Sequence, residues 1–391
     1  FNGNVSGWDL SGLVTSIGTQ NMFYNAVSFE GHGLETWNVS GVQIMKSMFR
    51  GTMINADLSS WDVSSVTEMN SMFYEAEVFE GHGLEVWDVS NVTNMSSMFR
   101  GTMINADLSS WDVSKVESIA GMFQYAQINF DITSWNVSSV KDMGGLFSGH
   151  SNFNQDISGW DVSSVESMSG MFNGAEAFNQ DLSSWDVSSV INMNSMFKDT
   201  EAFNQDLSSW DVSNVTNMNR MFDNTTVFNG DISNWDVSKV ENMITMFRST
   251  SAFNQDLSAW DTSSLTQAHS MFENATAFNG NVSGWDLSGL VTSIGTQNMF
   301  YNAVSFEGHG LETWNVSGVQ IMKSMFRGTM INADLSSWDV SSVTEMNSMF
   351  YEAEVFEGHG LEVWDVSNVT NMSSMFRGTM INADLSSWDV S

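Results

Sequence analysis

Residues 178–202 read FNQDLSSWDVSSVINMNSMFKDTEA, and variants of this 25-residue unit fill the chain of 391 residues. The sixteen tryptophans, one in each unit, follow one another at intervals of 24 to 29 residues, and six consecutive intervals are 25 residues long. Tandem repetition at a fixed period of 20 to 50 residues is typical of solenoids and related arrays. The period therefore decides the fold class before any single motif is considered.

Two apolar patterns occur inside each unit. Residues 182–187 read L-x-x-W-x-V, in which Trp185 and Val187 share one face of a short strand. Residues 190–197 place Val, Met, Met and Phe at positions i, i+3, i+6 and i+7, the spacing of an apolar stripe on one to two helical turns. This placement predicts that the methionines pack in the core and do not bind copper or haem.

A unit of this size cannot bury its apolar side alone, so it must stack on its neighbours. We expect a repeat solenoid over residues 1–391, a right-handed leucine-rich-repeat-like stack of about sixteen coils. Each coil of about 25 residues is expected to hold one short parallel β-strand and one short helical turn, with the strands on the concave side.

The repeated string resembles the BspA-like leucine-rich surface repeat, known from mycoplasma-type surface lipoproteins and classed as a domain of unknown function. Trp185, Asp186, Val187, Ser188, Met196 and Phe197 match its signature, which recurs along essentially the whole chain. The resemblance implies a right-handed leucine-rich-repeat solenoid on the outside of a cell and implies no catalytic residues.

A second, longer period is also present. Residues 278–391 repeat residues 1–114 without a change, at an offset of 277 residues. We interpret 1–277 as a first module of eleven coils and 278–391 as the start of an identical second module. This arrangement predicts that the sequence is a segment of a longer array. The irregular coils inside each module are the predicted sites of lateral contact between filaments or subunits.

Composition excludes several classes of protein. The net charge of −34 opposes binding to nucleic acid and to anionic membrane surfaces. The absence of cysteine excludes disulfide scaffolds and thiol chemistry. The sequence has no run of 18 apolar residues, so we expect no membrane-spanning helix.

Aspartate follows tryptophan in thirteen of the sixteen units. Stacked coils would align these carboxylates with serine hydroxyls, an oxygen-rich arrangement that suits Ca²⁺. The alternative, which we favour, is a column of aspartates bonded to serines or turns and screened by salt. The candidate metal ligands are Asp161, Asp186, Asp211, Asp236, Asp261 and Asp286. A second column is expected to cap turns: Asp156, Asp181, Asp206, Asp231 and Asp256.

Histidines and sequons give weaker signals. The sequence Glu-Gly-His-Gly occurs at 30–33, 80–83, 307–310 and 357–360, and a glycine-rich inserted loop is a better interpretation than a metal site. His150 and His269 are expected at the surface. Asn-x-Ser/Thr sequons occur little more often than chance predicts, and the glycosylation candidates are Asn4, Asn38, Asn91, Asn136, Asn214, Asn224 and Asn274.

These observations predict a non-enzymatic, extracellular structural protein that self-associates into a surface filament, sheath or fibre. It needs no cofactor in this interpretation, although Ca²⁺ is a possible ligand. The alternative is a cell-surface adhesin that binds a host or matrix ligand on its concave Ser/Asp face. The near-identical Ser-Trp-Asp-Val-Ser of successive coils favours the structural role, because a ligand-binding face should vary.

Overall fold

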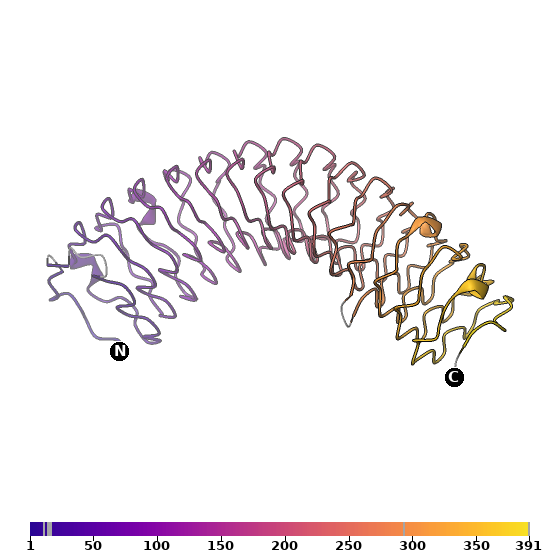
Figure 1. Ribbon diagram of the computed structural model, residues 1–391. Coiled ribbons are helices and arrows are strands. Elements are labelled where there is room, and N and C mark those ends of the chain that lie inside the picture. The colour runs from indigo at the N-terminus through magenta and orange to yellow at the C-terminus, as the bar shows by residue number, and fades with distance from the viewer. Residues whose placement is uncertain (11, 14–17, 292–293, 390–391) are drawn as a thin grey trace. The chain divides into compact units, whose positions relative to one another are not determined.

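The computed structural model describes residues 1–10, 12–13, 18–291 and 294–389. The chain divides into two compact units, Phe1–Ser189 and Val190–Ser391. Each unit is a stack of similar coils that follow one another in chain order, so the prediction of a repeat solenoid is confirmed at this level (Figure 1). The module boundary at residue 277 remains a prediction.

Columns of identical aromatic side chains form the core of each unit. In the first unit the rings of Trp37 and Trp61 stack at 6.1 Å between centroids, and those of Trp61 and Trp87 at 6.3 Å. The buried indole N–H groups also find acceptors in the preceding coil, as Trp61 Nε1 does at the carbonyl of Leu34 at 2.9 Å. Buried tryptophan needs such a partner. The hydrogen bond fixes the ring against the preceding coil and explains why every unit keeps this residue.

Phenylalanine forms a second set of columns beside the tryptophans. In the second unit Phe197 stacks on Phe203, the first residue of the next repeat, at 4.0 Å and on Phe222 of that repeat at 5.7 Å. Met193 and Met196 are fully buried beside these rings. The prediction that methionine, phenylalanine and tryptophan pack in the core is therefore confirmed.

The secondary structure inside the coils differs from the prediction. Within the described ranges the helices are four 3₁₀ turns: η1 (Leu34–Thr36), η2 (Leu84–Val86), η3 (Leu311–Thr313) and η4 (Leu361–Val363). Figure 1 draws them as coiled ribbons, η1 and η2 in the first unit and η3 and η4 in the second. The described chain has isolated parallel bridges in place of named strands.

The parallel ladder lies where the helical turn was expected. Bridges join Asn192 to Asn217 and Asn217 to Asn242, each next to the first methionine of its coil. The backbone N–H groups of Met193, Ser195 and Phe197 donate to carbonyls of the next coil at 2.8–3.0 Å. A helix would direct these groups to the residue four positions earlier. The expectation of a short helical turn at 190–197 is wrong, because alternate N–H groups bond between coils.

Tight turns fill the spaces between these inter-coil bonds. Met196 N–H donates to Met193 at 3.2 Å, and Ser195 has a φ of 55°. A positive φ outside glycine is uncommon and interrupts any regular helix. The 3.6-residue spacing of the apolar residues therefore arises from successive turns around a narrow core.

The expected strand at 182–187 is also wrong. Bridges at the residue after tryptophan are limited, in the described chain, to the pair Asp286 and Asn315. In other coils the aspartate side chain bonds to the serine two residues later and bends the chain, as Asp186 does with Ser188 at 3.0 Å. That bond uses the N–H group that a strand would offer to its neighbour.

Candidate functional site

The aspartates that follow tryptophan cap turns. The Oδ1 atom of Asp186 accepts from the backbone N–H of Ser188 at 3.0 Å and from its hydroxyl at 2.6 Å. The backbone bond recurs at 2.9–3.1 Å for each of the six candidate metal ligands, Asp161, Asp186, Asp211, Asp236, Asp261 and Asp286. These carboxylates thus act within their own coil.

Their charge is stabilised by the same bonds. The hydrogen bond from the hydroxyl of Ser188, followed by that from its backbone, lowers the pKa of Asp186 below the ordinary value of 3.8. Ser163 acts in the same way on the pKa of Asp161. A carboxylate with a lowered pKa remains ionised at neutral pH.

Metal coordination by this column is not supported by the arrangement. No group of three or more His, Cys, Asp or Glu side chains that could hold a metal ion occurs among the residues that the structure describes. Calcium needs six to eight oxygen ligands gathered around one point. The calcium site stays a prediction, and the capped-turn alternative accounts for the described geometry of all six aspartates.

The second aspartate column caps turns as predicted. Each carboxylate accepts from the backbone N–H of the serine two residues later at 2.8–3.1 Å. The residues concerned are Asp156, Asp181, Asp206, Asp231 and Asp256. One Asp-to-Ser turn therefore lies on each side of Trp160, Trp185, Trp210, Trp235 and Trp260.

The Glu-Gly-His-Gly segments form open hollows at the surface. Gly81 and Gly83 have φ values of 86° and 87°, and Gly83 leads directly into η2. A side chain at Gly83 would come within 2.2 Å of the backbone of the preceding coil, so the close approach requires glycine. The interpretation as a glycine-rich loop is confirmed.

Acidic and amide groups line the hollow beside His82. His82 Nε2 lies 3.4 Å from Glu80 Oε2, and Asp57, Glu85 and Asn105 also face the space of about 580 Å³. Comparable hollows occur at His32, His309 and His359, the one at His309 measuring about 850 Å³. Such a lining offers mainly hydrogen-bond acceptors and suits a hydroxyl-bearing or cationic ligand.

His150 contradicts the surface prediction. Its side chain is buried, and Nε2 accepts from the backbone N–H of Ile128 at 3.0 Å. Burial lowers its pKa below the ordinary value of 6.5. The ring fills a place in the core that Thr200 occupies in a later coil, which the sequence could have indicated by alignment of the units. His269 is half-buried, so it too lies deeper than expected.

The sequon asparagines divide into two groups by exposure. Five are exposed: Asn4, Asn38, Asn91, Asn136 and Asn214. Asn224 and Asn274 are half-buried with φ values near 60°, and Asn224 Nδ2 donates to Asp199 at 2.9 Å. Glycosylation remains a prediction at all seven positions, and the exposed group offers the more accessible amides.

Comparison with solved structures gives remote resemblances only. An internalin from Listeria monocytogenes is 12% identical over 85% of this chain and 80% of its own, with a TM-score of 0.21. TLR13, solved as a complex with ssRNA13, is 9% identical over 87% of this chain and 71% of its own, with a TM-score of 0.15. Scores this low carry no argument about the molecule.

Sequence comparison is more informative. No curated protein matches the chain. The family model described as "Mycoplasma protein of unknown function, DUF285" matches residues 1–100, 52–130, 125–224, 203–307 and 294–391. These five overlapping matches extend from the first residue to the last. The chain belongs to the mycoplasma DUF285 repeat family.

Proposed function

We propose that this protein is a non-enzymatic structural element of a cell surface, which self-associates into a filament, sheath or fibre. The observation that carries the proposal is the stacking of aromatic side chains from coil to coil, which recurs in both units. Trp235 stacks on Trp210 at 6.4 Å and donates to the carbonyl of Leu207 at 3.0 Å, as tryptophans do in the first unit. A stack held by repeated nearest-neighbour contacts can be lengthened by adding coils without a new core.

The uniform coil surface supports the same function. The turn aspartates are bonded to serines of their own coil, so they add charge and solubility without forming an individual site. The proposal places the chain outside the cell, because that is where the resembling surface repeats act. It assigns the chain no catalytic step and no obligatory cofactor.

Electron microscopy of the purified protein tests this proposal. The expected result is elongated assemblies whose length increases with protein concentration. Monodisperse single particles over the whole concentration range would overturn it. A parallel melting experiment with Ca²⁺, and with Mg²⁺ at the same ionic strength, tests cation cross-linking. A rise in Tm specific to Ca²⁺ would add a metal role to the proposal.

An adhesin is the second candidate function. The observation that favours it is the set of hollows beside His32, His82, His309 and His359, each of which is lined by the Glu-Gly-His-Gly segment and an asparagine or aspartate. The nearly invariant Ser/Asp face is a weaker candidate for the ligand-binding surface, because its carboxylates already accept hydrogen bonds inside each coil. A glycan array that gives one strong ligand, lost on replacing His82 and Glu80 by alanine, would promote this function.

A further inference from the structure

One surface column alternates between tyrosine and arginine over several successive coils. The column is the position directly after each Met-Phe pair. In the first four coils this position holds Tyr24, Arg50, Tyr74 and Arg100. The exact repeat restores the same alternation in the second unit as Tyr301, Arg327, Tyr351 and Arg377. The intervening coils carry other side chains at this position. We call the alternating residues of each unit the Tyr/Arg stripe.

Arginine and tyrosine side chains stack along the stripe. The guanidinium of Arg50 lies 5.3 Å from the ring centroid of Tyr24 and 4.0 Å from that of Tyr74. Arg100 continues the stripe, 5.0 Å from Tyr74 and 5.7 Å from Tyr125. In the second unit Arg327 lies 5.2 Å and 4.3 Å from its two tyrosines. Cation–π contacts of this kind hold the planar guanidinium groups in fixed positions.

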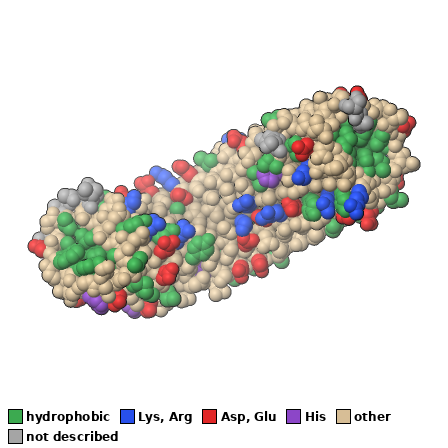
Figure 2. All heavy atoms as spheres, turned by 90° about the horizontal axis from the view of Figure 1, so that it is seen from below, with side chains coloured by type: hydrophobic (Ala, Val, Ile, Leu, Met, Phe, Trp, Pro, Cys, Tyr) green, Lys and Arg blue, Asp and Glu red, His purple; other side chains and the backbone are tan. Residues whose placement is uncertain are grey.

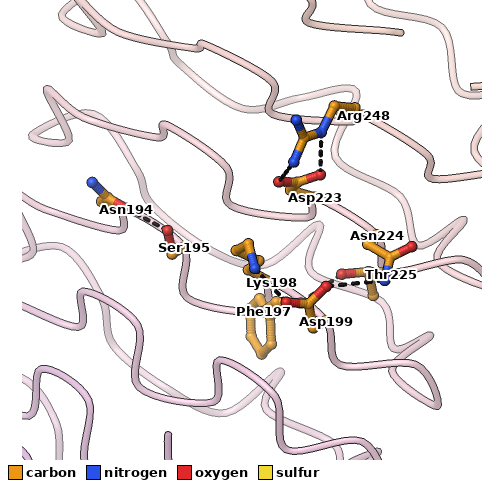
Figure 3. Close-up of polar contacts among 9 residues, drawn as sticks. All are labelled: Asn194, Ser195, Phe197, Lys198, Asp199, Asp223, Asn224, Thr225 and Arg248. Atoms are coloured by element: carbon orange, nitrogen blue, oxygen red, sulfur yellow. Dashed lines mark hydrogen bonds and ion pairs between the residues drawn. The ribbon is translucent and has the colours of Figure 1, made fainter. Parts of the chain in front are cut away.

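Two basic residues of this column in the intervening coils pair with carboxylates, as Figure 3 shows. Arg248 binds Asp223 of the preceding coil through Nε at 2.9 Å and through a terminal nitrogen at 2.7 Å. Asp223 is buried, and its hydrogen bond is the main cause that raises the pKa of Arg248. Lys198 likewise pairs with Asp199. In this part of the chain, basic residues of the same column therefore form ion pairs with carboxylates.

The stripe arginines have no such carboxylate. In the part of the chain that the structure describes, Arg50, Arg100, Arg327 and Arg377 make no ion pair, although the chain has 46 acidic residues. The Nε of Arg327 is also buried without a hydrogen-bond partner. A guanidinium group has five N–H donors and binds a carboxylate through two of them. The stripe thus presents fixed, unpaired cations.

Exposed apolar side chains occur in the same loops. Met53 and Met103 follow Arg50 and Arg100 by three residues and are 42% and 65% exposed. Tyr24 at the start of the first stripe and Tyr125, which contacts Arg100, are 45% and 59% exposed. Figure 2 shows basic side chains in short rows with hydrophobic side chains beside them on one face. Tyrosine, arginine and methionine are enriched at protein interfaces.

We propose that the Tyr/Arg stripe is a docking surface for a second copy of this chain, whose column of aspartates after tryptophan supplies the carboxylates. This inference rests on the self-association proposed above and names the surfaces that make it. The partner's Asp62, Asp112 and Asp161 use Oδ1 for their serine bonds and keep Oδ2 as an acceptor.

Charge and period both favour a second copy as the occupant. The chain carries a net charge of −34, so unpaired arginines are complementary to most of its own surface. The arginines of a stripe occur in every second coil, and the partner's Asp62, Asp112 and Asp161 also lie in every second coil, so the two spacings match. The identical sequence restores the stripe after 277 residues, so each of the two units carries the same candidate surface. Contact between two different surfaces propagates and does not close into a dimer.

The test is complementation between two variants. In the first, Arg50, Arg100, Arg327 and Arg377 become glutamine. In the second, the thirteen aspartates that follow tryptophan become asparagine, which caps the same turn at Asn38 and Asn136. Each variant keeps one surface of the proposed contact. A control with Lys115, Lys141, Lys198 and Lys239 changed to glutamine removes the same charge elsewhere.

Sedimentation velocity at about 10 mM salt, where screening is weak, measures the association of each protein. We expect the unmodified protein and the lysine control to self-associate and each variant alone to bind itself at least about tenfold more weakly. An equimolar mixture of the two variants should regain association. Circular dichroism establishes that both variants are folded.

The outcomes separate the two proposals. Equal association of the arginine variant and the unmodified protein, or a mixture that gains nothing over its components, would overturn the docking surface. If elongated particles still appear by electron microscopy in that case, the structural function stands with another contact. Unmodified protein that stays monomeric at low and at high salt would overturn both proposals.

Discussion

Replacing Trp235 by phenylalanine tests whether the stack is held coil by coil. The side chain is 2% exposed, and its Nε1 donates to the carbonyl of Leu207 at 3.0 Å. Phenylalanine keeps an aromatic ring in the column but has no N–H group and a smaller volume. The change therefore removes one buried hydrogen bond and part of the packing while it introduces no new polar group.

The expected cost follows from these two losses. A buried carbonyl left without its donor costs about 1–3 kcal/mol. The smaller ring loses buried apolar area and leaves a cavity, for roughly another 1 kcal/mol. Together they destabilise the coil by about 2–4 kcal/mol, which raises the equilibrium constant for local opening about 30- to 1,000-fold.

Hydrogen exchange followed by mass spectrometry measures the effect along the chain. In a stack with nearest-neighbour coupling, faster exchange should be confined to the coils that contain Trp235, Leu207 and Trp260. Trp61→Phe is the matched control in the other unit, because its indole makes the same bond to Leu34 at 2.9 Å. Equal acceleration over the whole second unit would refute nearest-neighbour stabilisation. Unchanged exchange at the Trp235 coil would refute the role of the indole bond.

Three further substitutions probe the turns and the core. Burial lowers the pKa of His150, so the unfolded chain binds a proton at this residue more readily than the folded chain does. The free energy of unfolding should therefore fall as pH drops below about 6.5. Urea unfolding at several pH values measures this fall, and His150→Gln should make it smaller. Asp186→Ala should cost about 1 kcal/mol in thermal melts, whereas Asp186→Asn should cost much less because it keeps the acceptor for Ser188; equal losses would contradict the capping role. Gly83→Ala should cost about 1–3 kcal/mol, since φ is 87° and the added carbon would meet backbone, and an unchanged melting temperature would show that this loop can move away.

The core could be predicted because the sequence repeats it. A residue that recurs once per coil in a stack must contact its own counterparts, so Trp185, Met193 and Phe197 identify the buried columns without any knowledge of the backbone path. The family resemblance led to the same architecture. His150 was misplaced because it breaks the pattern at one coil, and a single exception looks like a surface residue until the units are aligned.

Backbone geometry could not be read from the same spacing. Met193 and Phe197 are four residues apart, which a helix and a pair of consecutive tight turns satisfy equally well. The choice between them depends on whether the N–H of Phe197 bonds within the coil or to Met221 of the next, and the structure has the second arrangement at 2.9 Å. Such a bond joins residues 24 positions apart, so no local propensity reports it. Stacking overrides local preference here.

Variation between coils is more informative about function than the motif that defines the family. Trp185 and Asp186 recur because every coil needs the same stacking and the same turn: Trp185 bonds to Ile157 of the preceding coil, and Asp186 bonds to Ser188 of its own. The position after each Met-Phe pair has no such duty, so its side chain is free to change. At this position Arg248 forms an ion pair with Asp223, whereas Arg50 and Arg100 contact tyrosine rings and, within the described residues, no carboxylate. A surface contact is therefore to be sought where a repeat departs from its own consensus and leaves charges without partners.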